Sequence, residues 1–182
     1  LDGKIGIKTT TPAANLHVTG NTHISSDFTA ASVSIIGSSN FMPQGRLTLS
    51  TSNAVAYVNV TGATSIYYTP YEGNLIPLYD GTKFIQKSFS EITNTTTNNT
   101  TNPAACTTNS NYDLFVWDNG GTITLSRGPA WTSDTARGTG AGTTELQRLN
   151  GIWTNKVAIT NGPAANKGTY VGTVRTDGSS QV

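Results

Sequence analysis

The feature that most constrains this chain is a series of short alternating apolar runs separated by turn dipeptides. Each such segment predicts a hairpin, because Asp-Gly and Asn-Gly pairs tolerate the positive φ angles that a two-residue turn requires. No window of ten or more residues shows the periodicity of a helix. The three clearest segments are IPLYDGTKFIQKSF (76–89, with Asp80-Gly81 at the tip), YDLFVWDNGGTITL (112–125, turning at Asp118 to Gly121) and LQRLNGIWTNKVAI (146–159, turning at Asn150-Gly151). The sequence therefore predicts an all-β protein.

Further alternating runs extend this pattern over residues 44–182. They are RLTLST (46–51), AVAYVNV (54–60) and GTYVGTVR (168–175). The alternation predicts strands, with Leu47 and Leu49 on one face of the first. We expect residues 44–182 to form an antiparallel β-sandwich or barrel of about eight strands.

Residues 1–43 have weaker apolar runs that are broken by Gly, Asn and Ser. We expect strands of about four residues at Lys4 to Ile7 and at Asn15 to Val18, which are too short to be stable as an isolated ribbon. Each strand can bury its apolar side chains only against another copy of the chain or against the next short strand along a fibre shaft. The run GSSNFMPQG (37–45) has the composition of a linker. We therefore predict a short N-terminal β shaft and attachment region over residues 1–43, followed by a head domain over residues 44–182.

The charge distribution excludes several classes of partner. The chain has 11 basic and 10 acidic residues, which are scattered and give a net charge of +1. It thus lacks the basic footprint for nucleic acid or an acidic membrane, and no apolar run approaches the roughly 20 residues of a membrane-spanning helix. The single cysteine, Cys106, cannot form an intrachain disulfide, and we expect a buried or idle thiol. Because the sequence begins at Leu1 rather than at methionine, we expect a processed product or part of a longer chain.

The sequence carries no complete catalytic or metal-binding motif. The glycines of RGTGAGTTELQ (137–147) give G-x-G-x-G, which lacks the spacing and the following helix of a phosphate-binding loop. A turn separates the two histidines, His17 and His23. Symmetry copies of one histidine on a three-fold axis could hold an ion, but we expect a solvated or packed side chain instead. We therefore predict no metal and no cofactor.

Several carboxylates are available for a pair that cleaves glycosidic bonds, and sequence position alone does not exclude such a pair. They are Glu72, Glu91, Glu145, Asp80, Asp113, Asp118 and Asp134. Asp80 and Asp118 are explained as turn residues, and Asp113 as an ordinary strand-edge or surface carboxylate. We expect no catalytic residue among them and predict that the protein is not an enzyme.

The aromatic residues lie mostly at predicted strand positions. We expect them to fill the core or an interface between subunits, although exposed ones could stack on sugar rings. They are Tyr57, Tyr67, Tyr68, Tyr71, Tyr79, Phe84, Phe89, Tyr112, Phe115, Trp117, Trp131, Trp153 and Tyr170. Residues 93–111 (TNTTTNNTTNPAACTTNSN) form a low-complexity loop that we expect to be solvated padding, with sugar recognition as the alternative.

The N-terminal segment KIGIKTTTPAANLHVTGN (4–21) resembles the pattern G-I-G-T-T-x-P-x-A-x-L-H-V-x-G, which is common in tail fibres and tailspikes of bacteriophages and in related virion proteins. The matching residues are Gly6, Ile7, Thr9, Thr10, Pro12, Ala14, Leu16, His17, Val18 and Gly20. The segment departs from the pattern at Lys8, where glycine is usual. The same element occurs in bacterial surface proteins with intertwined β shafts.

Most of the remaining chain resembles a family of phage virion structural proteins, many of them identified as tail fibre or head decoration proteins. The similar segments are VTGATSIYYTPYEGNLIPLYDGTKF (60–84), FSEI (89–92), YDLFVWDNGGTITLSRGPAWTSDTAR (112–137), NGIWTN (150–155) and GTYVGTVRTDGSSQ (168–181). Members of that family commonly continue beyond a segment like RTDGSSQ, so we expect a further C-terminal stretch.

These resemblances imply a homotrimer, because fibrous phage appendages usually interleave short strands from three chains. Residues 1–43 then form the intertwined shaft and contact other virion proteins, and residues 44–182 form a display domain. We expect a virion structural protein on the phage tail or capsid surface, namely a tail fibre or receptor-binding fibre that contacts host surface polysaccharide. A capsid decoration protein or head fibre is the alternative, and a tailspike enzyme that degrades glycans is a further one.

Overall fold

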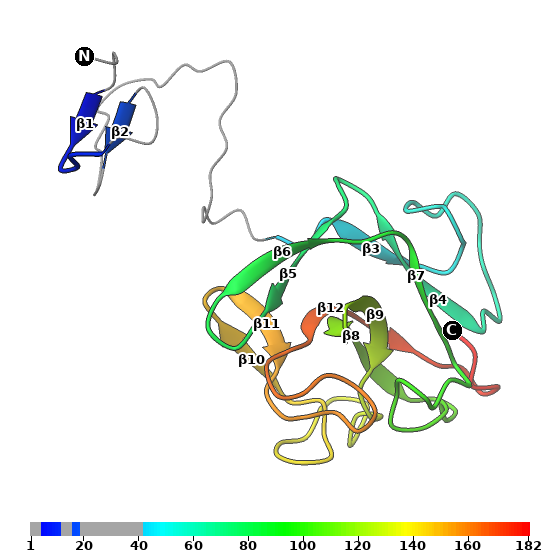
Figure 1. Cartoon of the computed structure of the whole chain (residues 1–182). Coiled ribbons are helices and arrows are strands. Elements are labelled where there is room, and N and C mark those ends of the chain that lie inside the picture. The colour runs from blue at the N-terminus through cyan, green and yellow to red at the C-terminus, as the bar shows by residue number, and fades with distance from the viewer. Residues whose placement is uncertain (1–4, 12–15, 19–41) are drawn as a thin grey trace. The chain divides into compact units, whose positions relative to one another are not determined.

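The computed structural model describes residues 5–11, 16–18 and 42–182, which form strands and turns without any helix (Figure 1). The chain falls into two compact units, Leu1–Ser38 and Ser39–Val182. The strands are β1 (Ile5–Ile7), β2 (Leu16–Val18), β3 (Gly45–Thr48), β4 (Ser65–Pro70), β5 (Leu75–Tyr79), β6 (Phe84–Ser88), β7 (Ile92–Thr95), β8 (Asn111–Asn119), β9 (Thr122–Arg127), β10 (Leu146–Leu149), β11 (Ile152–Asn155) and β12 (Thr169–Arg175). The predicted all-β class is confirmed.

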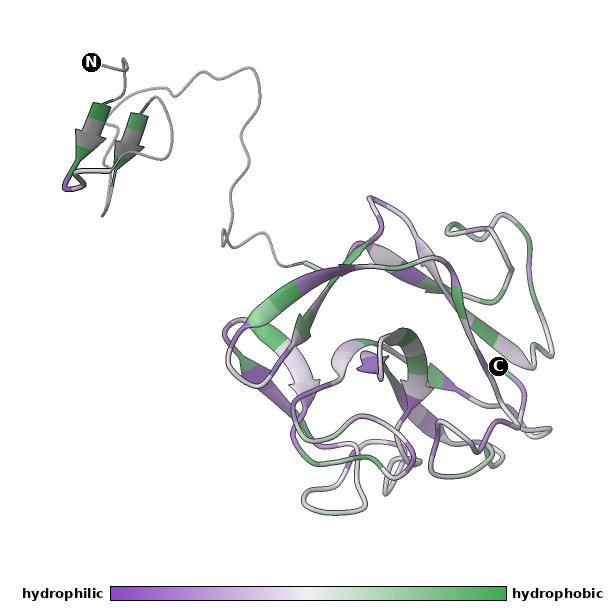
Figure 2. Cartoon of the chain, in the orientation of Figure 1, coloured by the Kyte–Doolittle hydropathy of each residue, from purple (hydrophilic) through white to green (hydrophobic). Residues whose placement is uncertain are grey.

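The described part of the first unit is a parallel pair of three-residue strands, with Ile5 of β1 opposite Leu16 of β2. Both strands lie where the sequence predicts them. Ile5, Ile7 and Leu16 are 62%, 49% and 60% exposed, and Figure 2 colours parts of both strands as hydrophobic. So short a pair needs a further surface to bury its apolar side chains. The ion site considered for His17 and His23 depends on side chains outside the described part of the chain.

The second unit contains a five-stranded sheet in the order β10-β11-β12-β8-β9, a three-stranded sheet in the order β3-β4-β7 and the hairpin β5-β6. All of its strand pairs are antiparallel, as expected, and residues 42–182 contain ten strands rather than about eight. Figure 1 shows the three-stranded sheet and the hairpin on one side of β8, β9 and β12. The apolar core lies between these layers and is made of Ile66, Tyr68, Ile76, Leu78, Phe89, Leu114, Val116 and Leu125.

Local turn chemistry explains the predicted hairpins. Asn150 and Gly151 have φ angles of 47° and 92° and are the only residues between the paired ends of β10 and β11. Gly120 and Gly121 join β8 to β9 in the same way, with φ angles of 61° and 96°. Two-residue turns of this kind match the twist of the strands they connect.

The hairpin β5-β6 forms as predicted, but its turn is longer than expected. Tyr79 pairs with Phe84, so residues 80–83 make the turn, rather than Asp80-Gly81 alone. The Asp80 carboxylate accepts the backbone N–H groups of Thr82 and Lys83 at 2.7 and 2.9 Å. This side-chain acceptor stabilises a wider turn than a two-residue one, which corrects the prediction.

The strand predicted at residues 54–60 (AVAYVNV) is wrong, because this segment is irregular and pairs with no described strand. The Glu91 carboxylate holds its start: it accepts hydrogen bonds of 2.6 Å from the Thr51 hydroxyl, the Ser52 backbone N–H and the Thr69 hydroxyl. Ser52 has a positive φ of 57°, which turns the chain away from the strand pair β3-β4. Tyr57 is left 81% exposed, and Figure 2 colours parts of the loop after β3 as hydrophobic.

Residues 93–111 are not solvated padding, because they fold around the buried guanidinium of Arg127. One of its terminal nitrogens donates to Asn94 Oδ1 at 2.6 Å and to the Thr95 carbonyl at 2.7 Å. The other donates to the carbonyls of Thr96, Asn98 and Ala104 at 3.2, 2.7 and 2.7 Å. The sequence prediction failed here because the charge that orders the loop comes from β9.

Candidate functional site

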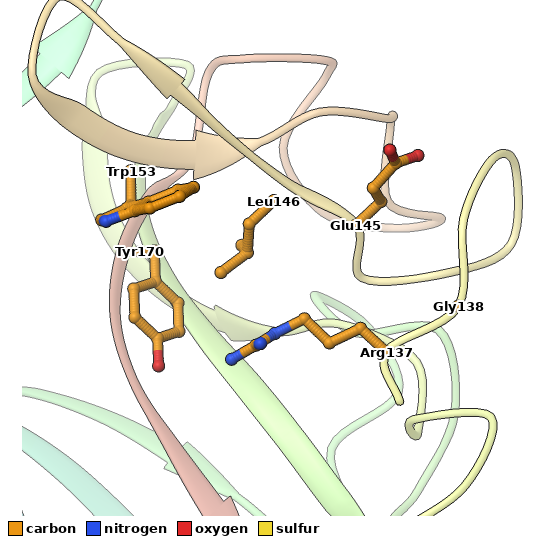
Figure 3. Close-up of a pocket in the computed structure, with 6 residues that line it drawn as sticks. All are labelled: Arg137, Gly138, Glu145, Leu146, Trp153 and Tyr170. Carbon is orange, nitrogen blue, oxygen red and sulfur yellow. The ribbon is translucent and has the colours of Figure 1, made fainter. Parts of the chain in front are cut away.

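Two hollows that share Trp153 and Tyr170 lie beside the hairpin β10-β11, where it meets β12 and the loop after β9. One has a volume of about 440 Å³, and Figure 3 shows its lining residues, Arg137, Gly138, Glu145, Leu146, Trp153 and Tyr170. The other has a volume of about 460 Å³, shares Trp153 and Tyr170 and adds Met42, Pro43, Arg148, Ile152 and the turn of the hairpin. We call the two together the Trp153 groove. Each half has the size of a small-molecule site.

The hairpin β10-β11 presents Trp153 and Arg148 side by side. They are directly opposite each other in the antiparallel register, so their side chains are neighbours on one face. Trp153 is 48% exposed, although core tryptophans bury most of their surface. The rigid turn at Asn150-Gly151 fixes this arrangement, and the Arg148 Nε atom donates to the Gly151 carbonyl at 3.2 Å.

Tyr170 faces Trp153 from β12, as Figure 3 shows. A β-bulge between Tyr170 and Gly172 interrupts the pairing of β12 with β8 at this point. Gly172 has a φ of 150°, a backbone conformation that residues with side chains rarely adopt, so a substitution there would be strained. Bulges re-aim side chains next to functional sites. The Tyr170 ring also packs edge-on against Phe115 in the core, with ring centroids 6.1 Å apart.

Arg137 lies at the bottom of the first hollow, between the rings of Trp131 and Tyr170. Its guanidinium carbon lies 4.3 Å from the centre of the Trp131 ring and 5.9 Å from that of Tyr170. Its Nε and one terminal nitrogen donate to the Asp113 carboxylate at 2.7 and 3.3 Å. Partial burial alone would lower the pKa of Arg137, but the hydrogen bond and the charge of Asp113 outweigh it and raise that pKa. The guanidinium is therefore fixed and permanently charged.

Asp113 is the buried anchor of this site rather than the surface carboxylate that the sequence suggested. Its side chain is 0% exposed and, besides Arg137, accepts the hydroxyls of Thr144 and Thr173 at 2.5 and 2.6 Å. The Thr173 hydroxyl is in turn 2.8 Å from the Tyr170 hydroxyl. Burying a charge is costly unless it is paired and hydrogen-bonded, and Arg137 supplies the pair for Asp113. One network thus holds both Arg137 and Tyr170 beneath the groove.

Glu145 lies at the end of the hollow away from Trp153 (Figure 3). Its carboxylate accepts Lys156 Nζ at 2.6 Å and the Gly140 backbone N–H at 2.8 Å. These two donors lower the pKa of Glu145. The glycine loop at residues 137–147 therefore turns an amide toward a carboxylate of the protein, and Gly138, Gly140 and Gly142 all have positive φ angles near 80°.

The structure brings together residues that the sequence considered separately. Trp153 and Tyr170 were among the aromatic candidates and Glu145 among the carboxylates, whereas Arg137 and Arg148 were not considered as site residues. Their positions 137, 145, 148, 153 and 170 belong to a loop and three strands. The alternation of β10 and β11 could have placed Arg148 beside Trp153, but nothing local in the sequence places Arg137.

The structure also bears on the cysteine, a turn carboxylate and the candidate metal ligands that the sequence analysis considered. Cys106 is buried, and burial raises the pKa of its thiol. Asp118 accepts the Gly121 N–H at 2.6 Å in its turn, in agreement with the role predicted from the sequence. No group of three or more His, Cys, Asp or Glu side chains gathers as metal ligands within the described residues.

The described residues also contain no helix that could cross a bilayer. Comparisons of the chain with models of protein families, with curated proteins and with solved structures find no match.

Proposed function

We propose that this protein is a non-enzymatic structural component of a bacteriophage virion appendage, a trimeric fibre that binds host surface polysaccharide through the Trp153 groove. The observation that carries the binding role is the half-exposed indole of Trp153 beside Tyr170 and the fixed guanidinium of Arg137. Flat aromatic faces stack on pyranose rings, and fixed polar groups at the edge select among their hydroxyls.

The preorganisation of the groove supports binding. Asp113 and Thr173 hold Arg137 and Tyr170 from below, and the two-residue turn of the hairpin sets the strand register that places Trp153 opposite Arg148. A ligand therefore orders few side chains when it binds, which lowers the entropic cost of association. Three such sites on one rigid trimer gain avidity toward a repetitive glycan without strong affinity at each site.

The state of the carboxylates favours binding over hydrolysis. Glycoside cleavage requires a pair of carboxyl groups, one of which acts as a proton donor with a raised pKa. Glu145 is the acidic residue lining the hollow, and Lys156 and the Gly140 amide lower its pKa instead. Asp113 lies beneath Arg137 with no exposed side-chain surface.

The exposed apolar residues of the first unit support the trimer. Ile5, Ile7 and Leu16 lie on three-residue strands that provide no core of their own. Three copies around an axis can bury these side chains against one another and remove the exposed strand edges.

The binding role is tested by measuring how the intact protein binds an array of bacterial surface glycans. We expect the Trp153→Ala variant to lose roughly tenfold or more in affinity, as is typical of an aromatic residue that anchors a ligand. The matched control is Tyr57→Ala, which removes an 81% exposed aromatic residue outside the groove and should leave binding unchanged. Equal binding by all three proteins would contradict the role of the groove.

The virion location is tested by cryo-electron microscopy of the intact phage. Density for this chain on the tail is expected. Density on the capsid shell would replace the receptor-binding fibre with a decoration protein, and the question would become how the protein grips the shell.

A further inference from the structure

The two halves of the Trp153 groove differ in charge, and this difference points to the class of saccharide. On the basis of the proposed function, we propose that the groove binds an acidic oligosaccharide, with a sugar carboxylate on Arg148 and a neutral neighbouring ring in the half lined by Arg137 and Leu146. Trp153 and Tyr170 stand between the two positions.

The Arg137 half is electrically balanced. Arg137 is paired with Asp113 at 2.7 Å, and Glu145 is paired with Lys156 at 2.6 Å. An additional anion placed here gains little from Arg137, because the buried carboxylate beneath already compensates its charge. The remaining surface is formed by Leu146 and the two aromatic residues, which suits an uncharged sugar ring.

The Arg148 half has an uncompensated cation. Within the described residues, no carboxylate forms an ion pair with Arg148. The Nε atom of Arg148 donates to the carbonyl of Gly151, and this hydrogen bond orients the guanidinium. No described residue accepts a hydrogen bond from the two terminal nitrogens of Arg148. That arrangement is ready for a planar bidentate acceptor such as the carboxylate of a uronic acid.

The dimensions of the groove accommodate more than one sugar unit. The hollows of about 440 and 460 Å³ are each large enough for a small ligand, and both include Trp153 and Tyr170 in their walls. A ligand that fills both halves therefore passes the aromatic pair. Because Arg148 is directly opposite Trp153 in the hairpin register, an acidic sugar at Arg148 and a ring stacked on Trp153 are adjacent.

The experiment uses the full chain, an array of acidic and neutral bacterial oligosaccharides, and carboxyl-reduced versions of the acidic ones. We expect the bound glycans to contain a uronic acid next to a neutral sugar, and carboxyl reduction to weaken binding by roughly tenfold or more. Arg148→Gln should weaken the acidic glycans by a similar factor and leave the reduced ones unchanged. The control Lys83→Gln removes the same charge from an exposed turn outside the groove and should change neither.

The outcomes separate this inference from the proposed function. Binding that tolerates carboxyl reduction, or that Arg148→Gln does not weaken, overturns the acidic class while the groove remains a glycan site. Binding that resists both Arg148→Gln and Trp153→Ala overturns the inference and places the site elsewhere. A failure of every glycan to bind contradicts the proposed binding role, and the inference fails with it.

Discussion

Two buried charges organise the second unit at the scale of single residues, and their partners differ in kind. Asp113 is paired with Arg137, whereas Arg127 is 0% exposed and is surrounded by an amide oxygen and backbone carbonyls. None of the ion pairs among the described residues includes Arg127. Burial accordingly lowers the pKa of Arg127, although the five donated hydrogen bonds retain the guanidinium in its cavity.

Replacing Arg127 with methionine should destabilise the protein and release the loop at residues 93–111. The apolar side chain leaves Asn94 Oδ1 and four carbonyls without their donor, and we expect the free energy of unfolding to fall by about 3 kcal/mol or more. Chemical denaturation measures this loss. The control Arg175→Met breaks a solvent-exposed ion pair with Asp134 and should leave the free energy of unfolding almost unchanged. Equal losses in the two variants would contradict the structural role of Arg127.

At the scale of elements, local chemistry decides what the sequence can predict. The turns at Asn150-Gly151 and Gly120-Gly121 require positive φ angles that their own residues supply, so the hairpins follow from the sequence. The run at 54–60 alternates like a strand, but whether such a run pairs depends on an available partner edge. In this chain the contacts of Glu91 and the turn at Ser52 divert it.

The Glu91 contacts predict a pH-dependent opening of residues 51–60. Burial would raise the pKa of Glu91, but the hydrogen bonds from Thr51, Thr69 and Ser52 outweigh it and lower that pKa. A carboxyl whose pKa is lowered by folding stabilises the folded state at pH values above its ordinary pKa. That stabilisation is lost as the pH falls below the ordinary pKa of a glutamate and through the lowered folded-state pKa of Glu91.

Hydrogen exchange measured by mass spectrometry checks this opening, after correction for the intrinsic rates. Amides in residues 51–60 should lose protection as the pH falls through the lowered pKa of Glu91. Glu91→Gln should show the same loss at neutral pH and little further change in acid. Glu72→Gln, which alters an exposed carboxyl group, is the control and should behave like the unaltered protein. Protection that is independent of both pH and Glu91 would show that other contacts hold the segment.

At the scale of the whole molecule, the candidate site depends on long-range sheet order. The order β10-β11-β12-β8-β9 brings Trp153 and Tyr170 together, and Arg137 reaches them from the loop between β9 and β10. The sequence identified exposed aromatics as one possible sugar platform, but it offered no rule that selects Trp153 among the aromatic residues. Asp113 was misinterpreted for the same reason, because its burial arises from Arg137, Thr144 and Thr173, 24, 31 and 60 positions away.

The trimer is a prediction about the whole molecule that concerns the first unit. Removal of residues 1–37 should lower the oligomeric order, because the trimer that we propose is held by β1 and β2. Light scattering coupled to size-exclusion chromatography measures the molar mass of the full and truncated chains.

A full-length variant with Ile5, Ile7 and Leu16 changed to serine separates the effect of apolar burial from that of chain length. It should dissociate as the truncated chain does, because its serine side chains no longer gain from burial between copies. A truncated chain that is still trimeric would place the interface in residues 38–182 instead, and the exposed loop around Tyr57 would be the first surface to examine by substitution.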